Sequence, residues 1–165
     1  MVFVTVGTHE QQFNRLLEEV DKIKGKGKIE EDVIIQTGYS SYKPLNCKWY
    51  KLVSYTQMQE YMKNARIIIT HGGPASFIQA LQLKKVPIVV PRQKKFGEHV
   101  NDHQLEFCIK IEKKLGNIIV VEDIGKLEKY IITYDDILKN NVVENISNNL
   151  NFNKNLDKIV SDMFK

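Results

Sequence analysis

The chain has 165 residues, of which 42% are hydrophobic, and this length suits one globular domain with a buried core better than two. Its formal charge of +4 favours a basic surface for phosphates or an anionic membrane, but is too small to indicate nucleic-acid binding. Cys47 and Cys108 form no CxxC pair, and no signal peptide or long apolar span is present. We therefore expect a cytoplasmic protein with reduced thiols.

Short apolar runs alternate with segments of helical periodicity along most of the chain. Such alternation predicts an α/β domain in which a doubly wound, Rossmann-like parallel sheet is covered by helices on both faces. Ser54 is placed to cap a helix that begins at Tyr55. Ligands of such a sheet bind at the carboxyl ends of the strands. The predicted strands are 2–6, 32–37, 49–53, 66–70, 86–90 and 117–121, and the predicted helices are 13–23, 55–64, 74–84, 99–114 and one near 127–134.

The last thirty residues carry a weaker pattern. An asparagine-rich segment separates the α/β domain, taken as residues 1–135, from a possible final helix within residues 136–165. That helix would present Leu156, Ile159, Val160 and Phe164 on one face. It is either a helix that docks on a partner or a frayed chain end.

The segment IIITHGGPAS, residues 67–76, ends a predicted strand in a glycine turn. Gly72 and Gly73 lack β-carbons, Pro74 suits the first position of a helix, and Ser76 adds a hydroxyl in its first turn. The free N–H groups of the helix N-terminus would favour an anion such as a diphosphate. The alternative is a tight strand-to-helix turn with no ligand.

A second turn of the same kind follows the first strand, where Gly7, Thr8 and His9 precede a helix. In a doubly wound sheet this turn can lie beside the later one and form a nucleotide site with it. No GxGxxG follows the first strand and no GxxxxGK occurs, which disfavours dinucleotide and P-loop sites.

The segment 91–108 is rich in residues that bind sugars and phosphates. Arg92 follows a strand, and Glu98, His103 and Gln104 come before or within the first turns of the next predicted helix. His99 and His103 lie four residues apart, so on one helix they could bind a metal with Glu98 or Asp102 as a third ligand. The remote thiols and the absence of HExxH argue against this metal site.

Two stretches resemble a known family. HGGPASFIQALQLKKVPIVVPRQKKFGEHVNDHQLE, residues 71–106, resembles the donor-binding half of family 28 glycosyltransferases, which have the two-domain GT-B fold. VFVTVGTHEQQFNRL, residues 2–16, is similar to the start of the small soluble subunits of two-part glycosyltransferases. One group of these makes capsular and exopolysaccharide repeat units and is the closer match. The other adds the second GlcNAc to dolichol-linked oligosaccharide.

The resemblance implies a role for each site residue. The backbone near Tyr55 would hold the uracil, and Gln79 stands where many members have a glutamate that binds the ribose. Charge stabilisation of the leaving group would come from helix N-termini and Arg92, so no metal cofactor is expected. His9 and Glu98 are candidates for the general base, which could also lie on a partner. The implied diphosphate site comprises Gly7, Thr8, His9, Gly72, Gly73 and Ser76, and the implied sugar site comprises His103 and Gln104.

The resemblance also implies a function and partners. The chain would be the donor-binding catalytic subunit of an inverting transferase, which moves a hexose from a UDP-sugar to a lipid-linked saccharide. Galactose in a β1,4 linkage is the first expectation and GlcNAc the second. A membrane-anchored subunit would bind the acceptor and hold this chain at the inner face of the membrane. The main alternative is a non-catalytic activator of a partner transferase. A nucleotide-sugar hydrolase or epimerase is less favoured, and a response-regulator-like binding module is less favoured still.

Overall fold

The computed structural model describes residues 1–145, in two units of the chain, 1–132 and from residue 133 onward. The predicted final helix and its residues Leu156, Ile159, Val160 and Phe164 lie outside the described residues. The second unit contains α6 (Tyr134–Asn145). No helix among residues 1–145 is long and apolar enough to cross a membrane.

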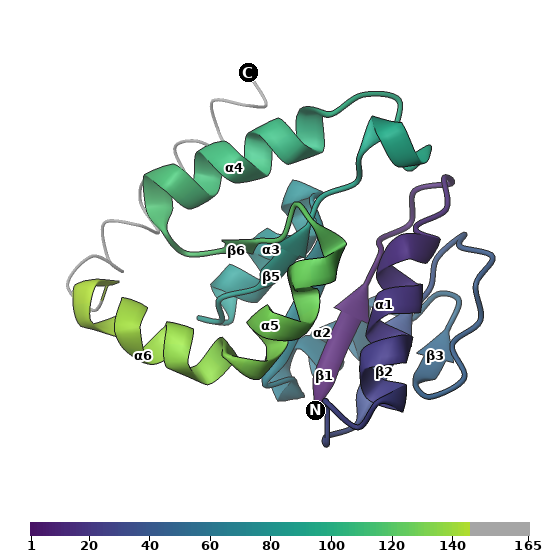
Figure 1. Ribbon diagram of the computed structural model, residues 1–165, viewed down its shortest axis with the longest axis horizontal. Coiled ribbons are helices and arrows are strands. Elements are labelled where there is room, and N and C mark those ends of the chain that lie inside the picture. The colour runs from purple at the N-terminus through teal and green to yellow at the C-terminus, as the bar shows by residue number, and fades with distance from the viewer. Residues whose placement is uncertain (146–165) are drawn as a thin grey trace. The chain divides into compact units, whose positions relative to one another are not determined.

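The first unit is built on six parallel strands in the order β3-β2-β1-β4-β5-β6, and Figure 1 shows β2 and β3 on the same side of β1. This order confirms the predicted doubly wound parallel sheet. The chain reverses its direction of winding between β1 and β4, whose register pairs Val4 with Ile69 and Thr5 with Thr70. The strands are β1 (Val2–Thr5), β2 (Val33–Gln36), β3 (Lys48–Tyr50), β4 (Ile67–His71), β5 (Ile88–Val90) and β6 (Ile119–Val120).

Helices cover both faces of the sheet. Phe3 and Ile68 of the sheet pack with Met62 of α2 and Ala80 of α3, and α4 joins this face through Cys108. On the opposite face α1 lies beside α5. The strands are buried on both sides, which explains their continuous Val and Ile runs. The helices are α1 (Asn14–Gly25), α2 (Tyr55–Asn64), α3 (Pro74–Gln82), α4 (His103–Leu115) and α5 (Leu127–Ile132), with short 3-10 turns η1 (Lys94–Phe96) and η2 (Ile124–Lys126).

Local signals placed most element ends correctly. Ser54 caps α2 as predicted, since its hydroxyl accepts the Gln57 N–H and the Gln57 side chain accepts the Ser54 N–H, forming a capping box. Most ends lie within two residues of the prediction, and two boundaries differ by more. β3 ends at Tyr50 rather than Val53, because residues after it turn toward the cap of α2. α4 begins at His103 rather than His99, because η1 and the loop after it take up the preceding residues.

A buried carboxylate fixes the loop between β2 and β3. Asp21 of α1 is 2% exposed and accepts the Leu45 N–H at 3.0 Å, the Asn46 N–H at 2.7 Å and the Tyr42 hydroxyl at 2.8 Å. Burial by itself would raise the pKa of Asp21, but these hydrogen bonds hold the pKa below its ordinary value. Asp21 therefore stabilises the fold in its charged form.

We predict that Asp21→Asn lowers the free energy of unfolding at neutral pH by about 1–3 kcal/mol, since an amide cannot accept all these donors. The lowered pKa makes this contribution present above the unfolded-state pKa near 3.9 and lost as pH falls through the native pKa. Urea unfolding at a series of pH values measures the difference between the two proteins. Glu18→Gln, on the exposed side of the same helix, is the control. Equal stability of wild type and Asp21→Asn at neutral pH would contradict this prediction.

Candidate functional site at the carboxyl ends of the strands

Three segments predicted to bind ligand meet at one edge of the sheet. The turn after β1 carries Gly7 to His9, the turn after β4 carries Gly72 to Ser76, and the loop after β5 runs from Pro91 to Asp102. β4 pairs with β1 on one side and with β5 on the other, so their carboxyl ends are neighbours. The sheet topology thus brings together residues that lie up to about 95 positions apart in the chain.

The side chain at the centre of this edge is His71, the last residue of β4. Its imidazole lies between the two glycine turns. A β-carbon added to Gly7 would lie 2.5 Å from His71 Cε1, and one added to Gly73 would overlap Nε2 and lie 2.9 Å from Cδ2. Neither turn could carry a side chain at these positions without displacing the ring. The ring therefore sets the spacing between the two turns.

This arrangement corrects the predicted role of the glycines. The sequence suggested that Gly72 and Gly73 lack β-carbons so that a phosphate can approach. In the structure the space beside Gly73 holds the His71 ring, and a β-carbon on Gly72 would lie 3.0 Å from Gln104 Cβ and 3.1 Å from Cys108 Sγ. Both glycines make room for protein side chains. The N–H groups of the α3 N-terminus have no side-chain cap.

His71 is held in its neutral form. Burial and then the charge of the nearby Arg92 lower its pKa to about 4, against a hydrogen bond with the Thr5 backbone that raises it. Its Nδ1 is buried and has no hydrogen-bond partner. The predicted site did not include His71, although a polar residue at the end of a buried apolar strand was a signal that could have identified it.

Arg92 does not lie where the sequence suggested. It was expected to reach a bound diphosphate from a loop, but the side chain is fully buried. Its guanidinium donates to the carbonyl oxygens of Val6 at 3.0 Å, of Gln11 and Gln12 at 2.9 Å each, and of Glu98 at 3.2 Å. Burial lowers the pKa of Arg92 to about 10, while Glu98 acts in the opposite direction. Arg92 therefore ties the β1 turn to the loop after β5.

Glu98 is likewise not the accessible loop carboxylate that a general base requires. It is fully buried, and it accepts Arg15 Nε at 2.8 Å, Arg15 Nη2 at 2.9 Å and the Gln93 N–H at 3.0 Å. Both carboxylate oxygens are therefore engaged in a bidentate ion pair. This burial and ion pairing disfavour Glu98 as the base, and the contact with Arg15 anchors α1 to the loop.

His9 is exposed but is poorly set up to accept a proton. Its Nδ1 accepts the Gln11 N–H at 3.1 Å, so the neutral ring carries its proton on Nε2. Burial, then Arg92 and His99, lower its pKa, which favours this neutral form. A neutral His9 thus presents an N–H donor rather than a free lone pair. This geometry suits contact with an anion better than general-base catalysis.

The start of α4 separates the two predicted sugar-binding residues. Gln104 lies over the glycine turn and its Oε1 accepts the Arg92 N–H at 3.3 Å, whereas the His103 side chain is 78% exposed and lies 3.8 Å from Glu106. His99 precedes the helix and packs against His9 at 5.2 Å between ring centroids. His99 and His103 therefore do not share a helix face, as a metal site would need. Within residues 1–145 no group of three possible ligands could hold a metal.

The other predicted residues lie along the same edge. Thr8 is exposed in the β1 turn, Ser76 and Gln79 are half-buried on α3, and Tyr55 is 73% exposed at the start of α2. Four of the six buried side-chain N and O atoms without a partner, counted over the part of the chain that the structure describes, belong to these segments or to α1 beside them. They are His71 Nδ1, Arg92 Nε, Arg15 Nη1 and Gln11 Oε1.

We predict that Glu98→Gln lowers stability by about 3 kcal/mol, because the partly buried Arg15 loses its charged partner. A catalytic base would behave differently, since its loss would stop transfer and leave stability unchanged. Thermal unfolding of the purified chain decides between these outcomes. Adding Arg15→Met to Glu98→Gln should recover part of the loss, and Glu106→Gln on the exposed side of α4 is the control.

We also predict that Gly73→Ala destabilises the chain by about 1–3 kcal/mol through overlap with His71. The backbone of Gly73 has φ −74°, which alanine adopts without strain, so the overlap is the whole cause. In a His71→Ala background the same change should cost little. Gly72→Ala is the matched control, because its β-carbon meets Gln104, Cys108 and Pro91 and His71→Ala should not relieve it. Equal relief of both glycine variants would disprove the His71 contact.

Comparison with known proteins is consistent with this architecture. The family model described as the glycosyltransferase family 28 C-terminal domain matches residues 1–160. No curated protein matches the sequence. One similar solved structure is the glycosyltransferase SnogD from Streptomyces nogalater, with TM-score 0.56 and 16% identity over 84% of this chain and 36% of that chain. Another is the glycotransferase of kitacinnamycin, with TM-score 0.58 and 15% identity over 79% of this chain and 34% of that chain. At such identities the likeness concerns the fold, and this chain spans about a third of those proteins.

Proposed function

Because the chain belongs to the family of glycosyltransferase family 28 C-terminal domains, we propose that it is the donor-binding part of a UDP-sugar-dependent glycosyltransferase. One observation carries this proposal. At the switch point of the sheet, the neutral His71, whose buried Nδ1 has no partner, lies near the charge of Arg92 and beside the N-terminus of α3, which no side chain caps. These groups favour a ligand that brings oxygen atoms, and a diphosphate has the matching charge.

The proposed diphosphate contacts come from backbone and exposed donors. The N–H groups after Gly73 and the hydroxyls of Thr8 and Ser76 would bind phosphate oxygens, with His9 donating from Nε2. Arg92 acts at longer range through its charge, because its N–H groups are used by carbonyls. On the basis of the family resemblance, we propose that the backbone near Tyr55 binds the uracil and that Gln79 binds the ribose.

The proposed reaction is an inverting transfer in which an acceptor hydroxyl attacks the anomeric carbon and UDP leaves. Charge on the leaving diphosphate would be stabilised by the α3 N-terminus, with no metal in the proposed mechanism. The general base is proposed to lie on a partner, since Glu98 is ion-paired and His9 presents a donor. A base on the acceptor side can accept the hydroxyl proton directly as the new bond forms.

The proposed partner is a membrane-anchored subunit that binds a lipid-linked saccharide, as in the two-part transferases that the sequence resembles. UDP-galactose with β1,4 transfer in capsular or exopolysaccharide synthesis is the first candidate reaction, and UDP-GlcNAc is the second donor. The engaged Glu98 and the glutamine at position 79 also favour a second function, that of a non-catalytic activator of a partner transferase. Direct donor binding by this chain distinguishes the two.

We predict that the purified chain binds UDP and UDP-sugar in calorimetric titration, and that EDTA leaves both affinities unchanged. Gln104→Ala should weaken UDP-sugar binding by about 0.5–1.5 kcal/mol more than UDP binding, because only the sugar complex uses the Gln104 amide. Glu106→Ala, exposed on the same helix, is the control. Failure of the wild-type chain to bind any UDP-sugar would overturn donor binding and leave the activator function. Equal losses for UDP and UDP-sugar would remove Gln104 from the sugar site.

A further inference from the structure

The segment around the edge strand β3 has an unusual surface. From Thr37 to Gln59 the sequence contains three lysines and no aspartate or glutamate. Among the described residues eight large hydrophobic side chains are exposed, and five of them fall within 39–55. They are Tyr39 (48% exposed), Leu45 (89%), Trp49 (37%), Leu52 (48%) and Tyr55 (73%), and the lysines are Lys43, Lys48 and Lys51. Tyr55 is kept for the uracil proposed above, and we call the other seven residues the β3 surface.

The residues of the β3 surface lie together in space. Among residues 1–145, β3 ends the sheet order and pairs with a strand on one side only, and Figure 1 shows it beside β2. The backbone N–H of Gly38 donates to the carbonyl of Lys51 at 2.8 Å, and the Lys51 ammonium lies 5.2 Å from the Tyr39 ring. Leu45 precedes the other end of β3, which is about 10 Å long. The β3 surface therefore extends along one lateral edge of the sheet.

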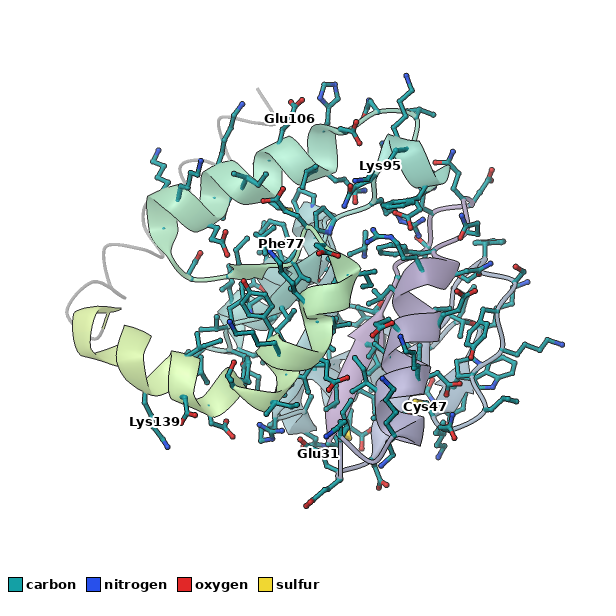
Figure 2. All side chains as sticks on the ribbon, in the orientation of Figure 1. Glu31, Cys47, Phe77, Lys95, Glu106 and Lys139 are labelled. Atoms are coloured by element: carbon teal, nitrogen blue, oxygen red, sulfur yellow. The ribbon has the colours of Figure 1, made fainter. Side chains whose placement is uncertain are left out.

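The loop that carries Leu45 is held rigidly. Asp21 accepts the N–H groups of Leu45 and Asn46 and is itself buried, so its charge does not offset the lysines in solvent. In Figure 2 the side chain of Cys47 lies beside α1 at this edge. A leucine that is 89% exposed on a pinned loop is a fixed apolar protrusion rather than a mobile tip.

We propose that the β3 surface contacts the anionic lipids of a membrane directly. Tryptophan, tyrosine and leucine enter the boundary between headgroups and acyl chains, while flanking lysines reach the phosphates. A second copy of this chain fits less well, because its own three lysines would face these. The side chains protrude, which suits a fluid lipid surface better than the packed recesses of a protein interface.

The acidic groups beside the surface set its limits. Glu18 of α1 is close enough to act on Tyr42, and Asp32 is close enough to act on Lys48. Both lie outside the segment 37–59, which has no aspartate or glutamate: Glu18 is in α1 and Asp32 directly precedes β2. Asp32 offsets part of the charge of Lys48, but no aspartate or glutamate stands between the three lysines in the segment 37–59, and salt leaves their charge unscreened over this short range. Contact would hold the chain by its lateral edge and leave the carboxyl ends of β1, β4 and β5 open.

Trp49 is the only tryptophan of the chain and lies within the β3 surface, so its fluorescence tests the proposal directly. The purified full-length chain is mixed with vesicles of phosphatidylcholine alone or of phosphatidylcholine with phosphatidylglycerol. We expect the emission of Trp49 to shift to the blue, and the protein to sediment, with anionic vesicles and low salt only. No shift of Trp49 with anionic vesicles overturns the proposal and leaves the lysines as protection of an edge strand against pairing.

Variants identify the surface responsible. Changing Lys43, Lys48 and Lys51 together to Gln should reduce vesicle binding by about fivefold per lysine. Changing Lys110, Lys113 and Lys114 of α4 to Gln removes the same charge from exposed positions elsewhere and should have little effect. Leu45→Ser should reduce the blue shift at unchanged charge. Equal losses of vesicle binding in the two triple-lysine variants would overturn lipid contact at this surface and indicate general charge attraction. An equal blue shift of Trp49 with soluble polyglutamate would also overturn it and indicate an acidic protein as the partner.

Discussion

The buried guanidinium of Arg92 holds together the edge of the sheet on which the whole site depends. Parallel strands end in loops whose carbonyl groups need donors once water is excluded. Arg92 supplies donors to carbonyls of Val6, Gln11 and Gln12 from one turn and of Glu98 from another. Glu98 then receives Arg15 of α1 and closes the network. Removing any member would leave a buried charge or carbonyl without a partner, so these residues act as one structural unit.

This network decides which residues remain available for chemistry. The two charged side chains that the sequence offered most plainly, Arg92 and Glu98, are fully buried in it. The charge of Arg92 still reaches the site, because burial and then Arg92 lower the pKa values of His9 and His71 and keep both rings neutral. Neutral histidines and helix N–H groups can surround a diphosphate without the cost of desolvating further charges. A diphosphate at this edge would therefore meet mainly N–H dipoles of neutral groups rather than charged side chains.

The two glycine turns show how packing and binding use the same residues. His71 fills the space that glycines at positions 7 and 73 leave, so the turns are held at a fixed distance before any ligand arrives. A preformed spacing lowers the ordering cost of binding. The exposed β3 surface lies at the end of the strand order, beyond β2, and includes no residue of these turns. The proposed donor binding and the proposed attachment to a membrane can therefore take place at the same time.

The sequence by itself determined the fold class, the helix cap at Ser54 and the meeting of the three segments that we predict to bind ligand. These features depend on local periodicity and on the rule that parallel strands end at one edge, which are readable along the chain. Only the tertiary structure decided what each polar residue does there. Glu98 and Arg15 lie 83 positions apart, and no local pattern shows that they pair. The space for a β-carbon at Gly73 is taken by the ring of His71, which comes from the preceding strand. The residue at which α4 begins depends on how the loop after β5 packs. Pairing partners and available space are set by the path of the whole chain, and therefore a residue type that fits a ligand can instead be used to hold the fold.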